Sequence, residues 1–198
     1  MNKISRGIKA AVVFIILVVA GYAIAVFWGS RNQVPVAFTD ARLQGALISQ
    51  DIVSISNSST DELAKVSQDD KQGDYTDALT LTTNLISQSQ QLRDKAVSLS
   101  NQVGIMTQSL SQIDSVGAQQ AALQSISSRL ALINQLITYS NDLDRLLGVL
   151  QARFSGKYEP TGTVDGIVNQ INTDVNAINN FNAQATQAMS QFDTIVKG

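Results

Sequence analysis

The sequence lacks the residues on which much enzyme and metal chemistry depends. It contains no cysteine and no histidine, which excludes disulfides, thiol nucleophiles, Ser-His and Cys-His catalytic arrangements and histidine metal ligands. Acid catalysis by carboxylates needs a close pair in a dry pocket, but the 16 acidic residues are spread along the polar faces of predicted helices. The sequence therefore predicts no catalytic residue, no metal ligand and no cofactor, and we expect a protein that is not an enzyme.

Charge is also scarce. Only 15% of the residues are charged, whereas Ser, Thr, Asn and Gln together supply 67 of the 198 residues. After the first nine positions, 11 Lys and Arg residues face 16 Asp and Glu residues, a net charge of −5. Because binding to phosphate backbones needs a basic face, we expect no nucleic acid partner.

One long hydrophobic run stands out against this polar background. Residues 10–28 (AAVVFIILVVAGYAIAVFW) contain no charge, and a helix of that length covers roughly 28 Å, the thickness of a bilayer core. Three basic residues precede the run, and the first acid is Asp40. By the positive-inside rule, the amino end stays in the cytoplasm. The predicted divisions are a cytoplasmic basic leader (1–9), a transmembrane helix (10–28), a linker (29–37) and an extracytoplasmic domain (38–198).

Two alternatives for the amino end remain open. Ala23-Ile24-Ala25 has the form of a signal-peptidase site, which would release a secreted helical protein. The apolar run continues to Trp28, further than a signal peptide needs. The basic leader ending in Gly7 resembles that of type IV prepilins, but Val12 stands where those subunits carry an acid.

The rest of the chain shows helical periodicity throughout. Start and stop signals predict four helices of about 34, 41, 37 and 34 residues, connected at Gly73, at Gly117 and through Ser155 to Gly162. Asp74 and Thr163 are the expected N-caps of the second and fourth helices. The polar stretch Asn57 to Thr60 predicts a kink or a short break in the first helix.

The second and fourth helices each carry a seam of apolar positions spaced alternately by four and three. Such a heptad repeat is typical of coiled-coil-like packing. The third helix carries two adjoining apolar stripes instead. The seam of the second helix is Ala78, Thr82, Leu85, Ser89, Leu92, Ala96, Leu99, Val103, Met106, Leu110 and Ile113. The seam of the fourth is Val164, Val168, Ile171, Val175, Ile178, Asn182, Ala185, Met189, Phe192 and Val196. The stripes of the third are Leu123, Ile126, Leu130, Ile133 and Ile137, and Leu132, Leu136, Tyr139, Leu143, Leu146 and Leu150.

Helices of similar length joined by short turns favour one fold class. We expect an all-α protein in which a single amino-terminal transmembrane helix precedes an elongated, up-down-up-down antiparallel four-helix bundle with coiled-coil-like packing. The polar seam residues Thr82, Ser89 and Asn182 are expected to set the register of this packing and not to bind a ligand.

In this topology the Gly73 turn and the loop at 155–162 share the membrane-distal tip. Aromatic residues in a polar surround are typical of an interface centre. The predicted partner-binding residues are Tyr75, Phe154, Lys157, Tyr158, Glu159 and Pro160. The alternative is that Tyr75 and Phe154 only close the end of the core.

A complete helical-bundle pattern without predicted catalytic residues, metal ligands or cofactor sites indicates a function in binding or structural support. We expect a single-pass membrane protein whose extracytoplasmic bundle is a non-enzymatic structural or interaction module of the cell envelope, with a protein partner there and possible self-association. The alternative is a small-molecule sensor, since extracytoplasmic bundles can bind ligands between helices.

Overall fold

The computed structural model describes residues 34–157 and 163–197, and within these ranges the fold is helical, without strands. This confirms the prediction of an all-α protein built from four packed helices. No helix in the described ranges has the length and apolar character needed to cross a membrane. The predicted span at residues 10–28 lies outside them. The elements are α2 (Val36–Gln72), α3 (Tyr75–Ser109), the short 3-10 helix η3 (Leu110–Gln112), α4 (Val116–Phe154) and α5 (Thr163–Lys197).

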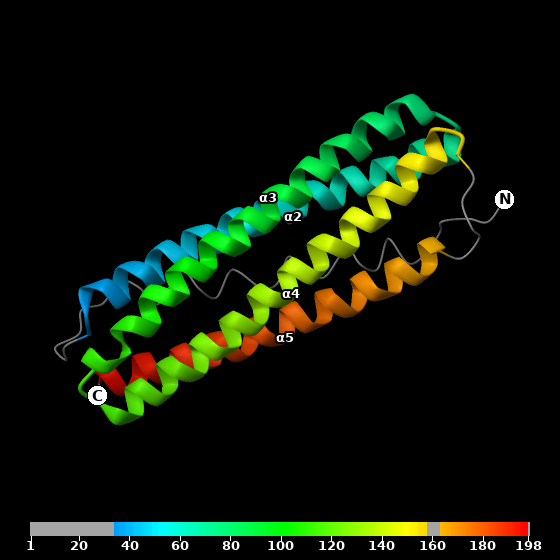
Figure 1. Ribbon diagram of the computed structural model, residues 1–198. Coiled ribbons are helices and arrows are strands. Elements are labelled where there is room, and N and C mark those ends of the chain that lie inside the picture. Colours follow the sequence, from blue (N-terminus) through cyan, green and yellow to red (C-terminus); the bar gives the residue numbers. More distant parts are fainter. Residues whose placement is uncertain (1–33, 158–162, 198) are drawn as a thin grey trace.

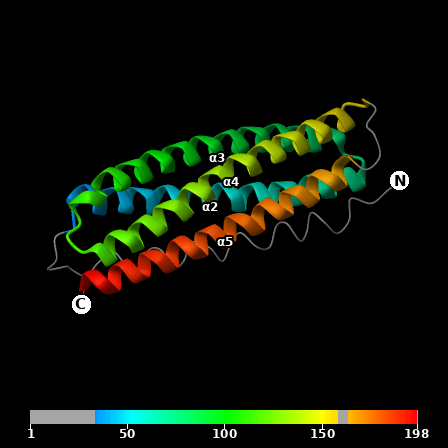
Figure 2. The same ribbon diagram turned by 60° about the horizontal axis from the view of Figure 1, so that its bottom comes forward.

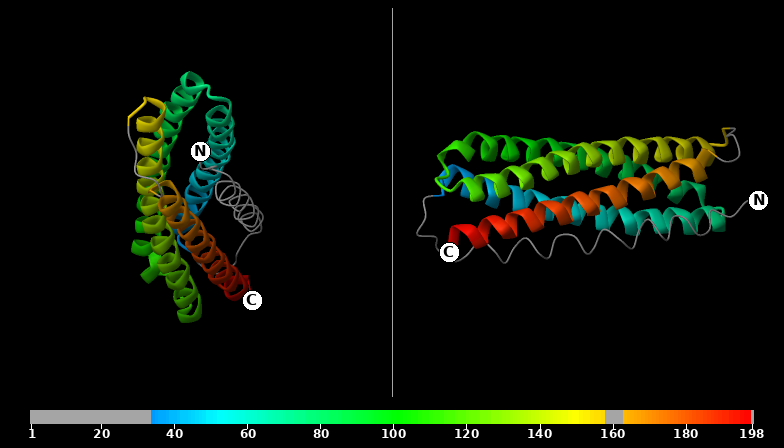
Figure 3. Two further views of the ribbon diagram at one scale, coloured as in Figure 1. Left: turned by 90° about the vertical axis from the view of Figure 1, so that its right-hand side faces the viewer. Right: turned by 90° about the horizontal axis from the view of Figure 1, so that it is seen from below.

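Consecutive helices run in opposite directions along an elongated bundle (Figures 1 and 2). The α2–α3 turn and the end of α4 lie at one end, whereas the α3–α4 connection and the end of α5 lie at the other (Figure 3). The pairs α2–α3, α3–α4 and α4–α5 pack closely, but the backbones of α2 and α5 stay further apart. The bundle therefore has one wide seam, between α2 and α5.

The turn between α2 and α3 contains the predicted helix-ending glycine and the predicted N-cap residue. Gly73 ends α2 with a φ of 79°, a left-handed conformation that a residue with a Cβ adopts only with strain. The Asp74 side chain then caps α3, because its Oδ1 accepts a hydrogen bond from the backbone N–H of Asp77 at 3.4 Å. Both signals were readable from the sequence because they are local.

The predicted seam of α3 forms the centre of the core along most of its length. Its first nine positions, from Ala78 to Met106, are all buried. They are the positions that the alternation by four and three selects, since that spacing keeps one face of a helix turned toward its neighbours. The prediction of the core face of α3 is confirmed.

The connection between α3 and α4 differs from the prediction. Helix α3 ends at Ser109, and the chain passes through η3 into Ile113, which is extended and only 3% exposed. Ser115 then caps α4 by accepting a hydrogen bond from the N–H of Ala118 at 3.3 Å. Gly117 therefore lies in the first turn of α4 and is not the turn itself. The chain leaves the helix early because Ile113 packs into the core from an extended backbone.

The predicted short break in the first helix is wrong, because α2 is one helix from Val36 to Gln72. Ser59 is 1% exposed, and its Oγ lies 2.9 Å from the carbonyl oxygen of Ile55 and 2.6 Å from Oε1 of Gln88 on α3. The hydroxyl thus finds partners without disrupting the backbone ladder.

Only one of the two stripes on α4 is fully buried. The stripe from Leu132 to Leu150 lies in the core, whereas Leu123 and Leu130 of the other stripe are 51% and 42% exposed. The reason is the order of the helices, since among the four described helices α4 packs closely only on α3 and α5. One flank of its apolar surface therefore faces outward.

Polar residues on the seams form hydrogen bonds both between helices and within one helix. The hydroxyls of Ser89 on α3 and Ser140 on α4 lie 2.9 Å apart, and each donates to the backbone carbonyl oxygen of the other residue at 3.1 and 2.9 Å. Thr82 donates to the carbonyl oxygen of Ala78 at 2.7 Å within α3. A shift along the α3–α4 pair would break the bonds between Ser89 and Ser140 but not the Thr82 bond. The expected role of Thr82, Ser89 and Asn182 in setting register stays a prediction.

Candidate functional site

The structure brings two of the predicted tip residues together. The rings of Tyr75 and Phe154 are stacked, with centroids 5.9 Å apart and planes at 22°. Phe154 is 5% exposed, whereas Tyr75 is 48% exposed. Phe154 thus closes the end of the core, and Tyr75 lies on it with about half of its surface open to solvent. The tip has a rigid aromatic base and an accessible ring above it.

Charged residues lie next to this pair in the sequence. Arg153 at the end of α4 forms an ion pair with Asp70 near the end of α2, with Nη2 3.0 Å from Oδ1, and this contact ties the two helix ends together. Lys157 is exposed. The other three predicted tip residues, Tyr158, Glu159 and Pro160, lie outside the described residues.

Near the opposite end, an ion pair and an aromatic pair bridge the wide seam. The guanidinium of Arg42 on α2 binds both carboxylate oxygens of Asp193 on α5, at 2.6 and 2.7 Å. The rings of Phe38 and Phe192 lie 5.3 Å apart just beside them. Because the backbones of α2 and α5 do not approach closely, these long side chains hold the two helices together at that end.

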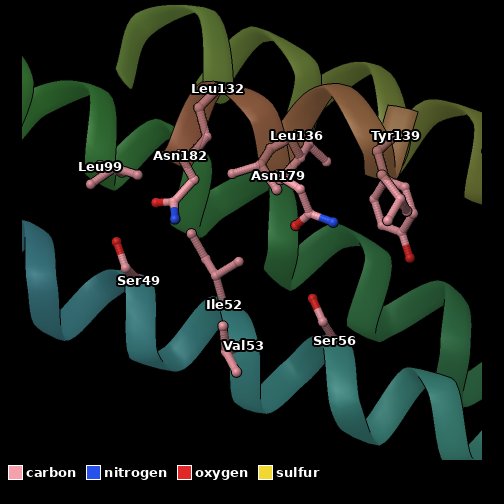
Figure 4. Close-up of a pocket in the computed structure, with 12 residues that line it drawn as sticks. Ser49, Ile52, Val53, Ser56, Leu99, Leu132, Leu136, Tyr139, Asn179 and Asn182 are labelled. Carbon is pink, nitrogen blue, oxygen red and sulfur yellow. The ribbon is translucent and has the colours of Figure 1, made fainter. Parts of the chain in front are cut away.

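Further along the seam, a small cavity opens where no such side chains bridge it (Figure 4). Its volume is about 60 Å³, whereas pockets for drug-sized ligands run from about 300 to 1,000 Å³. No charged side chain lines it, and its residues are Ser49, Ile52, Val53, Ser56, Leu99, Leu132, Leu136, Tyr139, Val175, Ile178, Asn179 and Asn182. The cavity is too small to enclose a metabolite, so it adds no support to the sensor hypothesis.

An acidic residue beside the cavity contradicts the expectation that the acids lie on polar faces. Asp174 on α5 is 0% exposed. Its Oδ1 accepts hydrogen bonds from Nε2 of Gln135 on α4 at 2.7 Å and from Nε2 of Gln170 at 3.0 Å. Its Oδ2 is buried and has no hydrogen-bond partner within the described chain. A buried carboxyl oxygen without a partner is rare in native proteins and calls for a physical explanation.

The surroundings of Asp174 make its ionisation unfavourable. Burial raises its pKa and the nearby charge of Asp142 on α4 raises it further, whereas the hydrogen bonds from Gln170 and Gln135 lower it. Asp142 is 8% exposed and accepts a hydrogen bond from Nη1 of Arg145 at 2.9 Å. Burial, together with the charge of Asp174, raises the pKa of the Tyr139 phenol to about 12, so this group stays neutral.

Sequence reasoning missed this group of residues. Asp174 directly precedes the seam residue Val175, and a position next to a seam is buried only if the neighbouring helix covers it. The available signal was weak: Gln170 stands four residues before Asp174, at the spacing that lets two side chains meet on a helix.

Carboxylates elsewhere do not assemble into a metal centre. In residues 34–157 and 163–197, no group of three or more Asp and Glu side chains is arranged to hold an ion. The geometry described above consists of helix-to-helix contacts, one small apolar cavity and one buried acid pair. Comparison with known protein families, curated proteins and solved structures gives no match for this chain.

Proposed function

We propose that this protein is a single-pass membrane protein whose helical bundle is a non-enzymatic structural or interaction module of the cell envelope. In this proposal residues 1–9 stay in the cytoplasm, residues 10–28 span the membrane, residues 29–37 form a linker, and residues 38–198 form the extracytoplasmic bundle with coiled-coil-like packing. The apolar run and its basic flank support the anchor.

One observation carries the proposal for the bundle. Four helices of 37, 35, 39 and 35 residues pack around an apolar core that also holds hydrogen bonds between helices, such as those between Ser89 and Ser140. A helix of 35 residues is about 50 Å long, so the bundle can hold its two ends far apart. Such a rod suits a spacer that presents a binding surface away from the membrane.

The surface best suited to a partner is the tip at Tyr75. Its ring is half exposed and rests on a buried Phe154, so little conformational entropy is lost when a partner covers it. Aromatic residues held in this way are common at the centres of interfaces. The proposed partner is another protein of the envelope.

Crosslinking in native membranes followed by affinity capture tests the interaction. We expect Tyr75→Ala to abolish capture of the partner while the bundle stays folded by circular dichroism. Leu47→Ala is the matched control, because Leu47 on α2 is also 48% exposed. Equal capture by both variants and the unmodified chain would show that the tip is not the interface.

Topology is tested separately. Protease added to cells stripped of outer layers should digest everything after about residue 29. Protection of the carboxyl end would overturn the assignment of the bundle to the outside, and purified protein beginning at Val26 would show that a signal peptide had been removed.

A further inference from the structure

In the buried carboxyl of Asp174, one oxygen accepts two hydrogen bonds and the other accepts none within the described chain. Oδ1 accepts from the Gln135 and Gln170 amides, but Oδ2 has no donor in the described chain. The Asp142 carboxylate, itself an acceptor, lies within hydrogen-bonding reach of the Asp174 side chain. Two ionised carboxylates in this arrangement would repel each other, and an ionised Asp174 would leave a buried lone pair without a partner.

A single proton resolves both problems. We propose that Asp174 is held in its neutral form, that its Oδ2–H donates to the Asp142 carboxylate, and that this proton acts as a latch between α5 and α4. The neutral acid then uses every polar atom: Oδ1 accepts two amide hydrogen bonds, and Oδ2 donates one. The exposed Arg145 contacts the Asp142 carboxylate at 2.9 Å.

Few other titratable groups act on the latch. In the described ranges, the charged or titratable side chains that interact with Asp174 are Asp142 and Tyr139, both on α4. Its own helix contributes Gln170, which is neutral. Tyr139 keeps its proton until about pH 12 because burial raises its pKa. Tyr139 therefore keeps its proton over the pH range in which the latch is tested.

The latch gives the α4–α5 contact a definite pH dependence. The pKa of Asp174 in the folded protein is raised above its ordinary value of 3.8. Its contribution to stability is thus fully present below about pH 3.8 and is lost as the pH rises through the folded pKa. Above that pH, two negative charges face each other between the helices, and we expect the α4–α5 contact around Gln135 and Asp142 to loosen.

Thermal unfolding of the full-length chain in neutral detergent, followed from pH 4 to pH 9.5, tests the latch. Asp174→Asn is the central variant, because an Asn side chain can accept from Gln135 and Gln170 and donate to Asp142 at every pH. We expect its melting temperature to equal that of the unmodified chain at pH 4 and to exceed it by several degrees at the alkaline end. Asp94→Asn, a change at an exposed acid of α3, should leave the difference between pH 4 and pH 9.5 unchanged.

Two further measurements test whether a proton, and not a bound cation, holds the latch closed. The side-chain carboxyl carbon of Asp174 should titrate above pH 3.8 by NMR, and hydrogen exchange in the middle of α5 should accelerate over the same range. A constant difference between Asp174→Asn and the unmodified chain at all pH values would overturn the latch, as would titration of Asp174 at its ordinary pKa. Recovery of the lost stability by millimolar Ca²⁺ at pH 9.5 would instead identify a cation site and refute the proton assignment.

Discussion

The aromatic pair at the tip allows the two roles of its members to be separated by truncation. Phe154 is 5% exposed, and replacing a buried Phe by Ala costs about 3 to 5 kcal/mol of unfolding free energy. Tyr75 is 48% exposed. It should lose about 1 kcal/mol of ring stacking and about 1 kcal/mol from its half-buried surface. The expected costs are thus about 4 kcal/mol for Phe154→Ala and about 2 kcal/mol for Tyr75→Ala.

These costs correspond to clearly different melting temperatures. For a domain of this size, 1 kcal/mol shifts the melting temperature by about 2 to 4 °C. We expect Phe154→Ala to lower it by about 12 °C and Tyr75→Ala by about 6 °C, measured by circular dichroism. If Phe154→Ala does not fold, Phe154→Leu replaces it, with a smaller loss.

A double-mutant cycle isolates the contact between the two rings. Because their centroids lie 5.9 Å apart, the double variant should be more stable than the sum of the single losses predicts, by about 1 kcal/mol. Strict additivity would show that the rings do not interact. Equal losses from Tyr75→Ala and Phe154→Ala would show that Tyr75 is a core residue, and its proposed role in binding would then lose its physical basis.

Two other sets of substitutions test the bundle. Asp193→Asn should lower the free energy of unfolding by about 1 to 3 kcal/mol in denaturant titrations, because it removes the carboxylate that pairs with Arg42 in a largely buried site. The double variant Arg42→Met with Asp193→Leu should recover most of this loss. An unchanged stability of Asp193→Asn would contradict this reasoning. Gly148→Ala should raise the melting temperature by about 1 to 4 °C, since nothing lies within 4 Å of its added Cβ. Gly73→Ala should lower the melting temperature because of the φ of 79°, and a gain there would show that the turn tolerates a Cβ.

The start and stop signals were sufficient to predict the number of packed helices, and the heptad spacing was sufficient to predict the core face of α3. The nine buried positions of α3 from Ala78 to Met106 follow from spacing alone, because a helix of fixed pitch turns every third or fourth residue to the same side. The caps at Gly73 and Asp74 were equally readable, since the residues that form them are adjacent in the chain. The aromatic pair of Tyr75 and Phe154 followed from topology, because alternating helices place the first and third connections at one end.

What the sequence could not decide depends on which helices become neighbours. Leu130 stays 42% exposed although it continues an apolar stripe, because among the described helices only α3 and α5 pack closely on α4. Ser59 leaves α2 uninterrupted because Gln88 on α3 meets its hydroxyl. Asp174, one position from a seam, is fully buried because α4 supplies Gln135 and Asp142 opposite it. The spacing of apolar residues and the capping of helices are local properties of the chain. Whether one side of a helix or an acidic side chain is buried depends instead on the helix that packs against it, and only the tertiary structure places that helix.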